Sequence, residues 1–311
     1  MIDDMYAIAK ANQLCNLYGI DTISTGVVVA FAIEAYEKGL ITKAQAGGLE
    51  IKWGNPEAVI KLIEKIGGRE DIGDLLAEGV WRAAGRIGGG AEDFALHVKG
   101  REVPMHEPRG KRSLGLMCAV AERGASHLEW EHDDNWDPDT SLRPELGLTA
   151  EYVPERGLLE YGISKVRIAK IAGDLWSILD CLPTCVFDVF PGGGLEYSTL
   201  LGIANAATGW KMTMREFMQV GERAIDLIRS FNAREGLTRK DDQLPKRLME
   251  PLPDGAFAGK PFAQEMLDSM LDNYYELRGW DKTTGIPTQA KLEAIGLRSV
   301  ADELAKLGKL P

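Results

Sequence analysis

The sequence has 311 residues, of which 45% are apolar and 27% charged, and its formal net charge is −11. This composition is typical of folded globular proteins, and the length suggests about two domains. The acidic balance disfavours nucleic acid and anionic membranes as partners, and the longest apolar run, 27–33, is too short to span a bilayer. Because the N-terminus lacks the basic region of a signal peptide and four cysteines form no disulfide framework, we expect a cytoplasmic protein.

Helical periodicity is the dominant pattern along the chain. The helices that it predicts, in chain order, cover residues 25–38, 56–66, 71–86, 215–233 and 266–277. The second of these begins at Asn55-Pro56-Glu57, which combines an N-cap, a proline in the first turn and an acid beside the positive helix end. The pattern therefore favours helices built from local start and stop signals.

The pattern between these helices indicates where the domains divide. Residues 94–103 are compatible with a short extended segment, and the prolines and glycine that follow predict a boundary there. We expect a mainly α fold with two helical domains, 1–104 and 105–311. The acidic, proline-containing stretch 131–144 predicts a solvated surface loop, and the proline-rich stretch 244–261 predicts an ordered connector.

Chemistry is first suggested by residues 16–26, which lead into the first predicted helix. Asp21, Thr22, Ser24 and Thr25 are all N-cap candidates, and the start of such a helix can bind an anion. A simple capped helix start is the more common explanation of this composition.

A second candidate segment contains Asp180, Cys181 and Cys185 around a proline. Cysteine thiolates ligate iron–sulfur clusters and zinc. A single Cys-x3-Cys pair is a weak metal signal, however, and two cysteines buried in a core are the alternative.

The third candidate is Arg123-Gly124-Ala125-Ser126-His127, which is followed by His132. Acidic residues surround the second histidine: Glu129, Glu131, Asp133 and Asp134. A histidine near carboxylates can carry protons, and an acidic loop can bind a hard cation, although this spacing is not that of an EF-hand. The alternative is a structural histidine beside a solvated acidic loop.

Taken together, these segments resemble the tungsten-containing aldehyde:ferredoxin oxidoreductase family over almost the whole chain, in its second and third domains. The matching segments, in the family's order, are 15–26, 76–88, 108–110, 123–127, 231–236, 242–245, 274–281 and 285–287. Members of this family hold tungsten, or sometimes molybdenum, through the dithiolene sulfurs of two pterins. The resemblance thus implies a bis-pterin metal cofactor and a [4Fe–4S] cluster.

The resemblance also implies roles for individual residues. Residues Asn16, Gly19, Ile20 and Asp21 belong to the segment that looks like the first pterin-binding motif, and Asp180, Thr184 and Cys185 to the second. Asp180 is implied to bind a pterin amine, and Cys185 to be one cluster ligand. His127 stands where the family has an active-site histidine that donates a proton or polarises a carbonyl.

The sequence departs from the family at several points, which include the lack of the active-site glutamate expected upstream of the first pterin motif. Asn16 replaces an aspartate, and Pro183-Thr184 replaces Gly-Leu in the second motif, which changes the freedom of the backbone. The Cys-x-x-Cys-x-x-x-Cys segment, which supplies three cluster ligands, and the pterin-covering first domain are not in this sequence. We therefore expect a second chain, or a further N-terminal segment, to supply both.

The expected function follows from the resemblance: the C-terminal portion of an oxidoreductase that oxidises small aldehydes to carboxylic acids and passes electrons to ferredoxin. The isolated chain is expected to be incomplete as an enzyme. One alternative is a relative that acts on another substrate, such as a benzoyl-CoA reductase-type subunit. A second alternative is a helical fragment or interaction module without a cofactor.

Overall fold

The computed structural model describes residues 2–130, 132–136, 146, 148–155, 157–189 and 194–311. Helices dominate these residues, and the sheet found among them is a single two-stranded hairpin, so the predicted mainly α fold is confirmed. The chain forms two compact units. Unit 1 comprises Met1–His106, Arg123–Ala125 and Leu244–Arg247, and unit 2 comprises Glu107–Glu122, Ser126–Gln243 and Leu248–Pro311.

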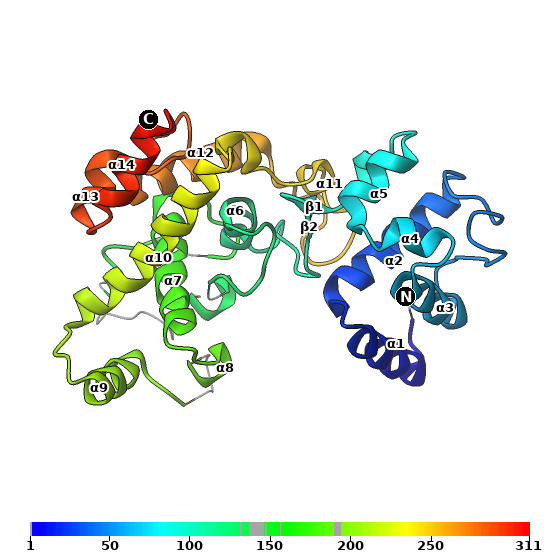
Figure 1. Ribbon diagram of the computed structural model, residues 1–311, viewed down its shortest axis with the longest axis horizontal. Helices are drawn as coiled ribbons and strands as arrows, with labels where there is room; N and C mark the ends of the chain where they lie inside the picture. Colours follow the sequence, from blue (N-terminus) through cyan, green and yellow to red (C-terminus); the bar gives the residue numbers. More distant parts are fainter. Residues whose placement is uncertain (1, 131, 137–145, 147, 156, 190–193) are drawn as a thin grey trace. The chain divides into compact units, whose positions relative to one another are not determined.

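Unit 1 is a group of helices around a central apolar one (Figure 1, blue to cyan). Its elements are α1 Met5–Tyr18, α2 Thr22–Glu37, α3 Pro56–Gly68, α4 Ile72–Leu76, α5 Gly79–Ile87, η1 Ala91–Phe94, β1 His97–Val98 and β2 Arg101–Glu102. Helix α2 contacts α1, α3, α5 and β2, and its valines lie in the core. The two strands pair antiparallel within the segment predicted to be extended.

Short-range capping explains where the first three helices begin. Asp4, Asp21 and Asn55 are the N-caps of α1, α2 and α3, and each side chain accepts a backbone N–H in the following turn. Such caps stabilise a helix by roughly 1 kcal/mol each. Asn55 was predicted as a cap, whereas α1 was not predicted as a helix at all.

The single helix predicted over 71–86 is wrong, because the structure has two helices, α4 and α5, in this region. Gly79, the first residue of α5, has a φ of 81°, a left-handed value that separates the two helices. The Glu102 carboxylate accepts the N–H of Val80 at 2.9 Å and so satisfies a donor in the first turn of α5. The partner lies 22 residues away, which is why local periodicity did not reveal the break.

Among the described residues, no single helix is long and apolar enough to cross a membrane. Helices α1 and α2 pass the length and composition test only as a pair, bent by 115°.

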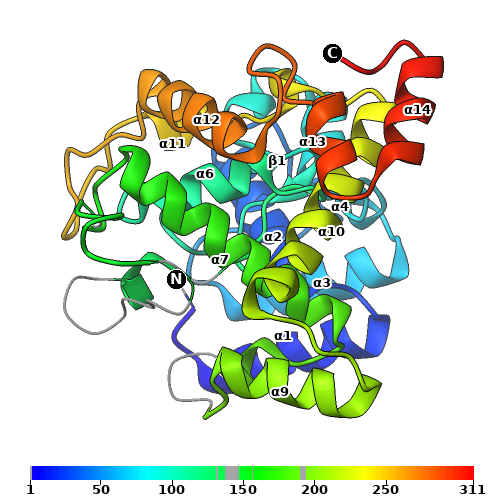
Figure 2. The same cartoon turned by 90° about the vertical axis from the view of Figure 1, so that its left-hand side faces the viewer.

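Unit 2 is larger and is built on two long helices, α7 and α10. Its elements are α6 Arg112–Val120, η2 Asp133–Trp136, α7 Ile163–Cys181, α8 Val186–Val189, α9 Tyr197–Thr208, α10 Met214–Arg234, η4 Arg239–Asp241, α12 Gln264–Arg278, α13 Gln289–Ala294 and α14 Arg298–Lys306. Helix α11, Lys246–Met249, contains residues of both units. Helix α7 packs against α6, α10 and α12, which both views show beside it (Figures 1 and 2).

The crossing of α7 and α10 depends on a glycine. A Cβ added at Gly221 of α10 would lie 1.9 Å from the carbonyl oxygen of Asp174 on α7. Leu175, Ile178 and Phe217 are buried around this crossing. The absence of a side chain at Gly221 therefore allows the two backbones to meet.

The prediction that 131–144 is a solvated acidic loop is wrong for Asp133. Glu131 and 137–144 lie outside the described residues, but Asp133 is 1% exposed. Its carboxylate pairs with the Lys165 ammonium at 2.7 Å and accepts the N–H groups of Ser113 and Leu114. Asp133 thus satisfies donors in the first turn of α6 from a distant part of the chain.

Candidate functional site

The first predicted motif is a turn between two helices in unit 1. Asn16 lies in the last turn of α1, and Gly19 ends that helix with φ of 67°. The N–H of Ile20 donates to the carbonyl of Cys15 at 3.0 Å, which closes the helix end. Asp21 is exposed, and one of its carboxylate oxygens accepts the N–H of Ser24 at 2.6 Å. The capped helix start that the sequence suggested is therefore present.

A small cavity of about 270 Å³ lies beside this motif. Ile20 and Asp21 line it, together with Glu78, Glu102 and the first turn of α2. Carboxylate oxygens accept hydrogen bonds from amines, and with charged donors these bonds are the strong ones. Glu78 pairs with Arg69 and Glu102 accepts the Val80 N–H, so both of these carboxylates already have partners within unit 1.

The second predicted motif has the same turn in unit 2. Asp180 lies in the last turn of α7, and the N–H of Thr184 donates to the carbonyl of Leu179 at 2.9 Å. This bond spans five residues, as does the bond from Ile20 to Cys15 in the first motif. Cys185 follows immediately, just before α8. The turn therefore keeps its closing hydrogen bond although proline replaces the family's glycine.

The cysteines of the second motif face solvent. Cys181 and Cys185 are both exposed with free thiols, whereas Cys15 and Cys118 are buried. The alternative of two buried core cysteines is therefore wrong for this segment. Partial burial, followed by the charge of Asp180, raises the pKa of the Cys181 thiol, which disfavours its thiolate. The exposed thiol of Cys185 is able to face a group that lies outside the described residues.

His127 lies half-buried at the edge of an aromatic cluster in unit 2. The His132 ring nitrogen Nε2 lies 2.9 Å from the His127 carbonyl oxygen, and the two rings meet edge-on with centroids 6.2 Å apart. His132 in turn stacks on the fully buried Trp130, at 6.1 Å between centroids. His132 therefore fits the structural interpretation, and it positions the backbone that carries His127.

The predicted site residues lie in both units. The first motif is in unit 1, and the second motif and His127 are in unit 2. Within the described part of the chain, no group of three or more histidine, cysteine or acidic side chains is arranged to hold a metal ion. The described side chains therefore do not form a complete metal centre.

Sequence reasoning missed the polar network that the C-terminal motif segments build inside unit 2. Arg229 pairs with Asp242 at 2.7 Å, and the Tyr275 hydroxyl also donates to Asp242. Trp280 Nε1 donates to Asp226 at 2.6 Å, where burial raises the pKa of that carboxyl to about 6. Asp242, Tyr275 and Trp280 belong to the segments 242–245 and 274–281, and the other two residues lie on α10. Charged residues are rarely fully buried, so nothing in the sequence indicated that these are.

Comparison with known proteins identifies the class of fold and then the family. Residues 1–297 match the family model described as aldehyde ferredoxin oxidoreductase, domains 2 and 3. The tungsten-containing aldehyde ferredoxin oxidoreductases of Thermococcus kodakarensis and Pyrococcus furiosus are 36% and 37% identical over 300 residues, which is 95% of this chain and 46% of each relative. The aliphatic sulfonate oxidoreductase, WOR-like subunit, of Pyrococcus furiosus is 30% identical over 97% of this chain and 44% of that protein.

A solved structure agrees with these sequence relatives. It is the active-site complex BamBC of benzoyl coenzyme A reductase with 1,5-dienoyl-CoA, with a TM-score of 0.70 and 27% identity over 94% of this chain and 46% of that one. The fold is thus that of a helical oxidoreductase. The chain belongs to the aldehyde ferredoxin oxidoreductase family, and it spans about half the length of the curated relatives it matches.

Proposed function

We propose that this chain forms domains 2 and 3 of an oxidoreductase that converts aldehydes to carboxylic acids and passes the electrons to ferredoxin. The observation that carries the proposal is the 36–37% identity, over 95% of the chain, to relatives named tungsten-containing aldehyde ferredoxin oxidoreductases. In this reaction an aldehyde and water yield an acid, two protons and two electrons. A bound tungsten or molybdenum pterin supplies the redox chemistry, and the protein supplies position and electrostatics.

The described residues supply only part of the ligand set that an iron–sulfur cluster needs. The free, exposed thiol of Cys185 supplies one thiolate, whereas such clusters are usually held by four. The described residues contain no cluster of side chains that completes the set. We therefore propose that polypeptide outside this sequence brings the remaining ligands, either as a second chain or as a further segment.

The two turns fit the pterins through their polar side chains. Asp180 offers a carboxylate at the end of α7 that binds a pterin amine by a charge-assisted hydrogen bond. Asn16 offers a neutral amide at the corresponding place in the first motif, five residues before Asp21. The backbone of Gly19, Ile20 and Thr184 forms the turns that set these side chains.

His127 is proposed to hold or donate a proton near the reacting aldehyde. The imidazole is half-buried, and its backbone is held by the hydrogen bond to His132. A positioned histidine accelerates proton transfer by about a hundredfold to ten-thousandfold.

The experiment that tests the proposed function compares two neighbouring cysteines. The protein is purified anaerobically with its associated polypeptides, and iron, tungsten, molybdenum and pterin are measured. Cys185→Ser should lose iron, whereas the matched control Cys181→Ser, also exposed, should retain it. A wild-type protein without tungsten, molybdenum and pterin would contradict the proposal and favour the cofactor-free interaction module.

A second candidate function is supported by the BamBC structure, which aligns over 94% of this chain. In this alternative the same metal cofactor acts on a coenzyme A thioester instead of a free aldehyde. Assays of the metal-loaded protein distinguish the two: reduction of a viologen dye by acetaldehyde or benzaldehyde supports aldehyde oxidation. Activity confined to 1,5-dienoyl-CoA or benzoyl-CoA supports the second candidate.

A further inference from the structure

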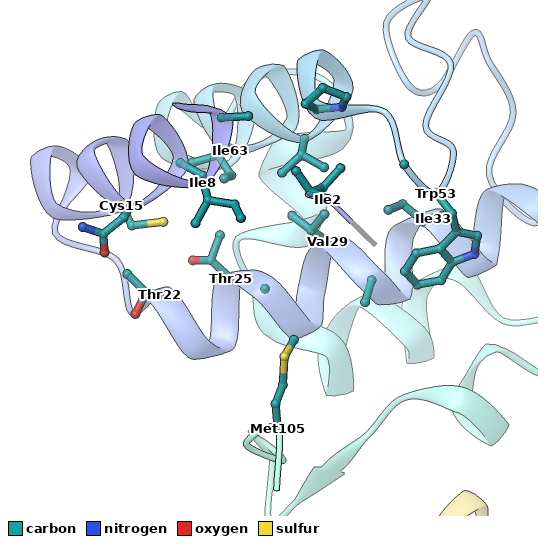
Figure 3. Close-up of a pocket in the computed structure, with 18 residues that line it drawn as sticks. Ile2, Ile8, Cys15, Thr22, Thr25, Val29, Ile33, Trp53, Ile63 and Met105 are labelled. Carbon is teal, nitrogen blue, oxygen red and sulfur yellow. The ribbon is translucent and has the colours of Figure 1, made fainter. Parts of the chain in front are cut away.

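Unit 1 has an apolar groove between α1, α2 and α3, with a volume of about 550 Å³ (Figure 3). Side chains of all three helices point into it: Ile8 and Cys15 from α1, Thr25, Val29 and Ile33 from α2, and Ile63 from α3. Trp53 and Met105 stand at its margins and are 49% and 78% exposed. Helices α1 and α2 diverge by 115°, which leaves the space between them open.

Helix α2 has the composition of a helix that is buried on every side. Its middle reads Val27 to Ile33 with apolar residues at all seven positions, so no polar stripe is available to face water. A helix that is apolar all round belongs inside a core. The face of α2 toward α5 and β2 is covered, but the face with Val29, Ala30 and Ile33 lines the groove. Val29 and Ile33 are only 6% and 3% exposed, so they form the floor of the groove.

Helix α1 also carries exposed apolar side chains. Met5, Tyr6 and Leu17 are 72%, 89% and 73% exposed, and Ile8 is 45% exposed. Ile8 lines the groove, whereas Tyr6 and Leu17 lie about half a turn away on the opposite face of α1. Exposed apolar side chains gathered at a groove mark an interaction site.

The polar groups of the groove do not favour a small ligand. The Thr25 hydroxyl donates to the Asp21 carbonyl at 2.6 Å, and Trp53 Nε1 donates to the Glu37 carboxylate at 2.9 Å. Small-molecule sites use a few convergent polar groups to orient their ligand. Here two of those groups are already engaged within unit 1, so shape and apolar contact dominate.

We propose that the groove between α1, α2 and α3 receives an apolar segment of the polypeptide that carries the rest of the family fold. The matching family model covers domains 2 and 3, and the relatives are about twice as long as this chain, so the family protein contains substantial polypeptide outside it. An apolar segment in the groove would cover the floor that α2 forms. The choice of partner rests on the proposed function, whereas the apolar groove rests on the structure alone.

Covalent footprinting of apolar side chains tests the inference on the protein as it exists in its source. A photolysed diazirine labels the purified native protein, and the isolated 311-residue chain is the reference. In the native protein, labelling of Ile8, Trp53 and Met105 should fall to the level of the buried Leu62. Leu307, which is 53% exposed on the C-terminal helix end and lies outside the groove, should be labelled equally in both.

Mass spectrometry then identifies what protects the groove. Protection by a polypeptide with the Cys-x-x-Cys-x-x-x-Cys segment, fused or separate, supports the inference. Full labelling of the native protein, protection by a second copy of this chain, or protection by lipid that is lost on solvent extraction would each overturn it. Because metal content is measured separately, a protected groove without metal would reject the proposed function and keep this inference.

A substitution inside the groove provides an independent test. Ala30→Trp fills the space on α2, whereas the matched control Lys61→Trp places the same ring on an exposed part of α3 outside the groove. Ala30→Trp should abolish co-purification of a separate partner, or expose Trp53 and Met105 to labelling if the segment is fused. Circular dichroism should show native helix content in both variants, and unchanged protection in Ala30→Trp would contradict the inference.

Discussion

Arg229 on α10 and Asp242 form a bidentate ion pair that is almost completely buried, with N···O distances of 3.0 and 2.7 Å. The Arg229 guanidinium also donates to the carbonyl of Gly285, and the Tyr275 hydroxyl donates to Asp242. The pair therefore joins α10, α12 and the segment after η4. Burial of two charges is costly, and it is tolerated here because each charge has several hydrogen-bond partners.

Removing one charge of this pair should destabilise the protein strongly. Asp242→Asn leaves the buried Arg229 without a countercharge and should lower the free energy of unfolding by about 3–5 kcal/mol. Urea unfolding followed by circular dichroism measures the change. The control is Glu276→Gln at the exposed pair with Lys282, which should leave the unfolding midpoint unchanged. Equal effects of the two substitutions would show that the buried pair contributes no more to the free energy of unfolding than the exposed pair does.

Asp226 should make stability fall as the pH rises from about 4 to 6. Burial raises the pKa of its carboxyl to about 6, against the attraction of Arg278 and Lys291. In this range the folded state holds a proton that the unfolded state has released, so unfolding becomes easier with rising pH. Over the shift from 3.8 to about 6 the effect is about 3 kcal/mol. Urea unfolding of wild type and Asp226→Asn at several pH values isolates the contribution of Asp226 to the free energy of unfolding. If that free energy changed with pH equally in both proteins, the prediction would be refuted.

The close crossing of α7 and α10 should not tolerate a methyl group. Gly221→Ala places a Cβ 1.9 Å from the Asp174 carbonyl oxygen, and such overpacking costs about 1–3 kcal/mol or more. The matched control is Gly202→Ala in α9, where a Cβ meets nothing within 4 Å. That substitution should stabilise by about 0.5–1 kcal/mol through helix propensity. Thermal unfolding should show a lower midpoint for Gly221→Ala and a higher midpoint for Gly202→Ala. An unchanged midpoint in Gly221→Ala would disprove the tight crossing.

His127→Ala should lower turnover of the metal-loaded protein by about a hundredfold or more if the imidazole transfers a proton. Metal and pterin content should stay at wild-type values, because His127 is proposed to hold neither. His97→Asn in the β1–β2 hairpin serves as the control histidine, since its ring accepts a backbone N–H from Gly100 and lies in unit 1. Turnover of His127→Ala equal to that of the control would assign His127 a structural role.

Local signals predicted part of the fold well. The start of α3 at Asn55-Pro56 was correct because its cap acts within three residues. Helix α7 was not predicted, although it has 19 residues. Its Lys165 and Asp174 look like surface residues in the sequence, but they are buried against Asp133 and Arg278, which lie 32 and 104 residues away. No local pattern contains those partners.

The candidate site, like the fold, was predictable from the sequence only in part. The spacing of Asn16 to Asp21 and of Asp180 to Cys185 was readable along the chain, and it carried the family resemblance that the comparisons confirmed. The exposure of Cys185 was not readable, because free cysteines are usually buried. The shared turn of the two motifs was also hidden, since it consists of backbone hydrogen bonds and not of matching side chains.

The order of residues along the chain was sufficient to identify the family, the helical class and the cap of α3, whereas for α2 it left four cap candidates, of which Asp21 is the one used. The ion pair of Arg229 with Asp242, the contact at Gly221 and the open groove beside Val29 were decided only in three dimensions. Each arises where helices distant in sequence meet, or fail to meet, and the free energy of burial depends on which atoms come together there.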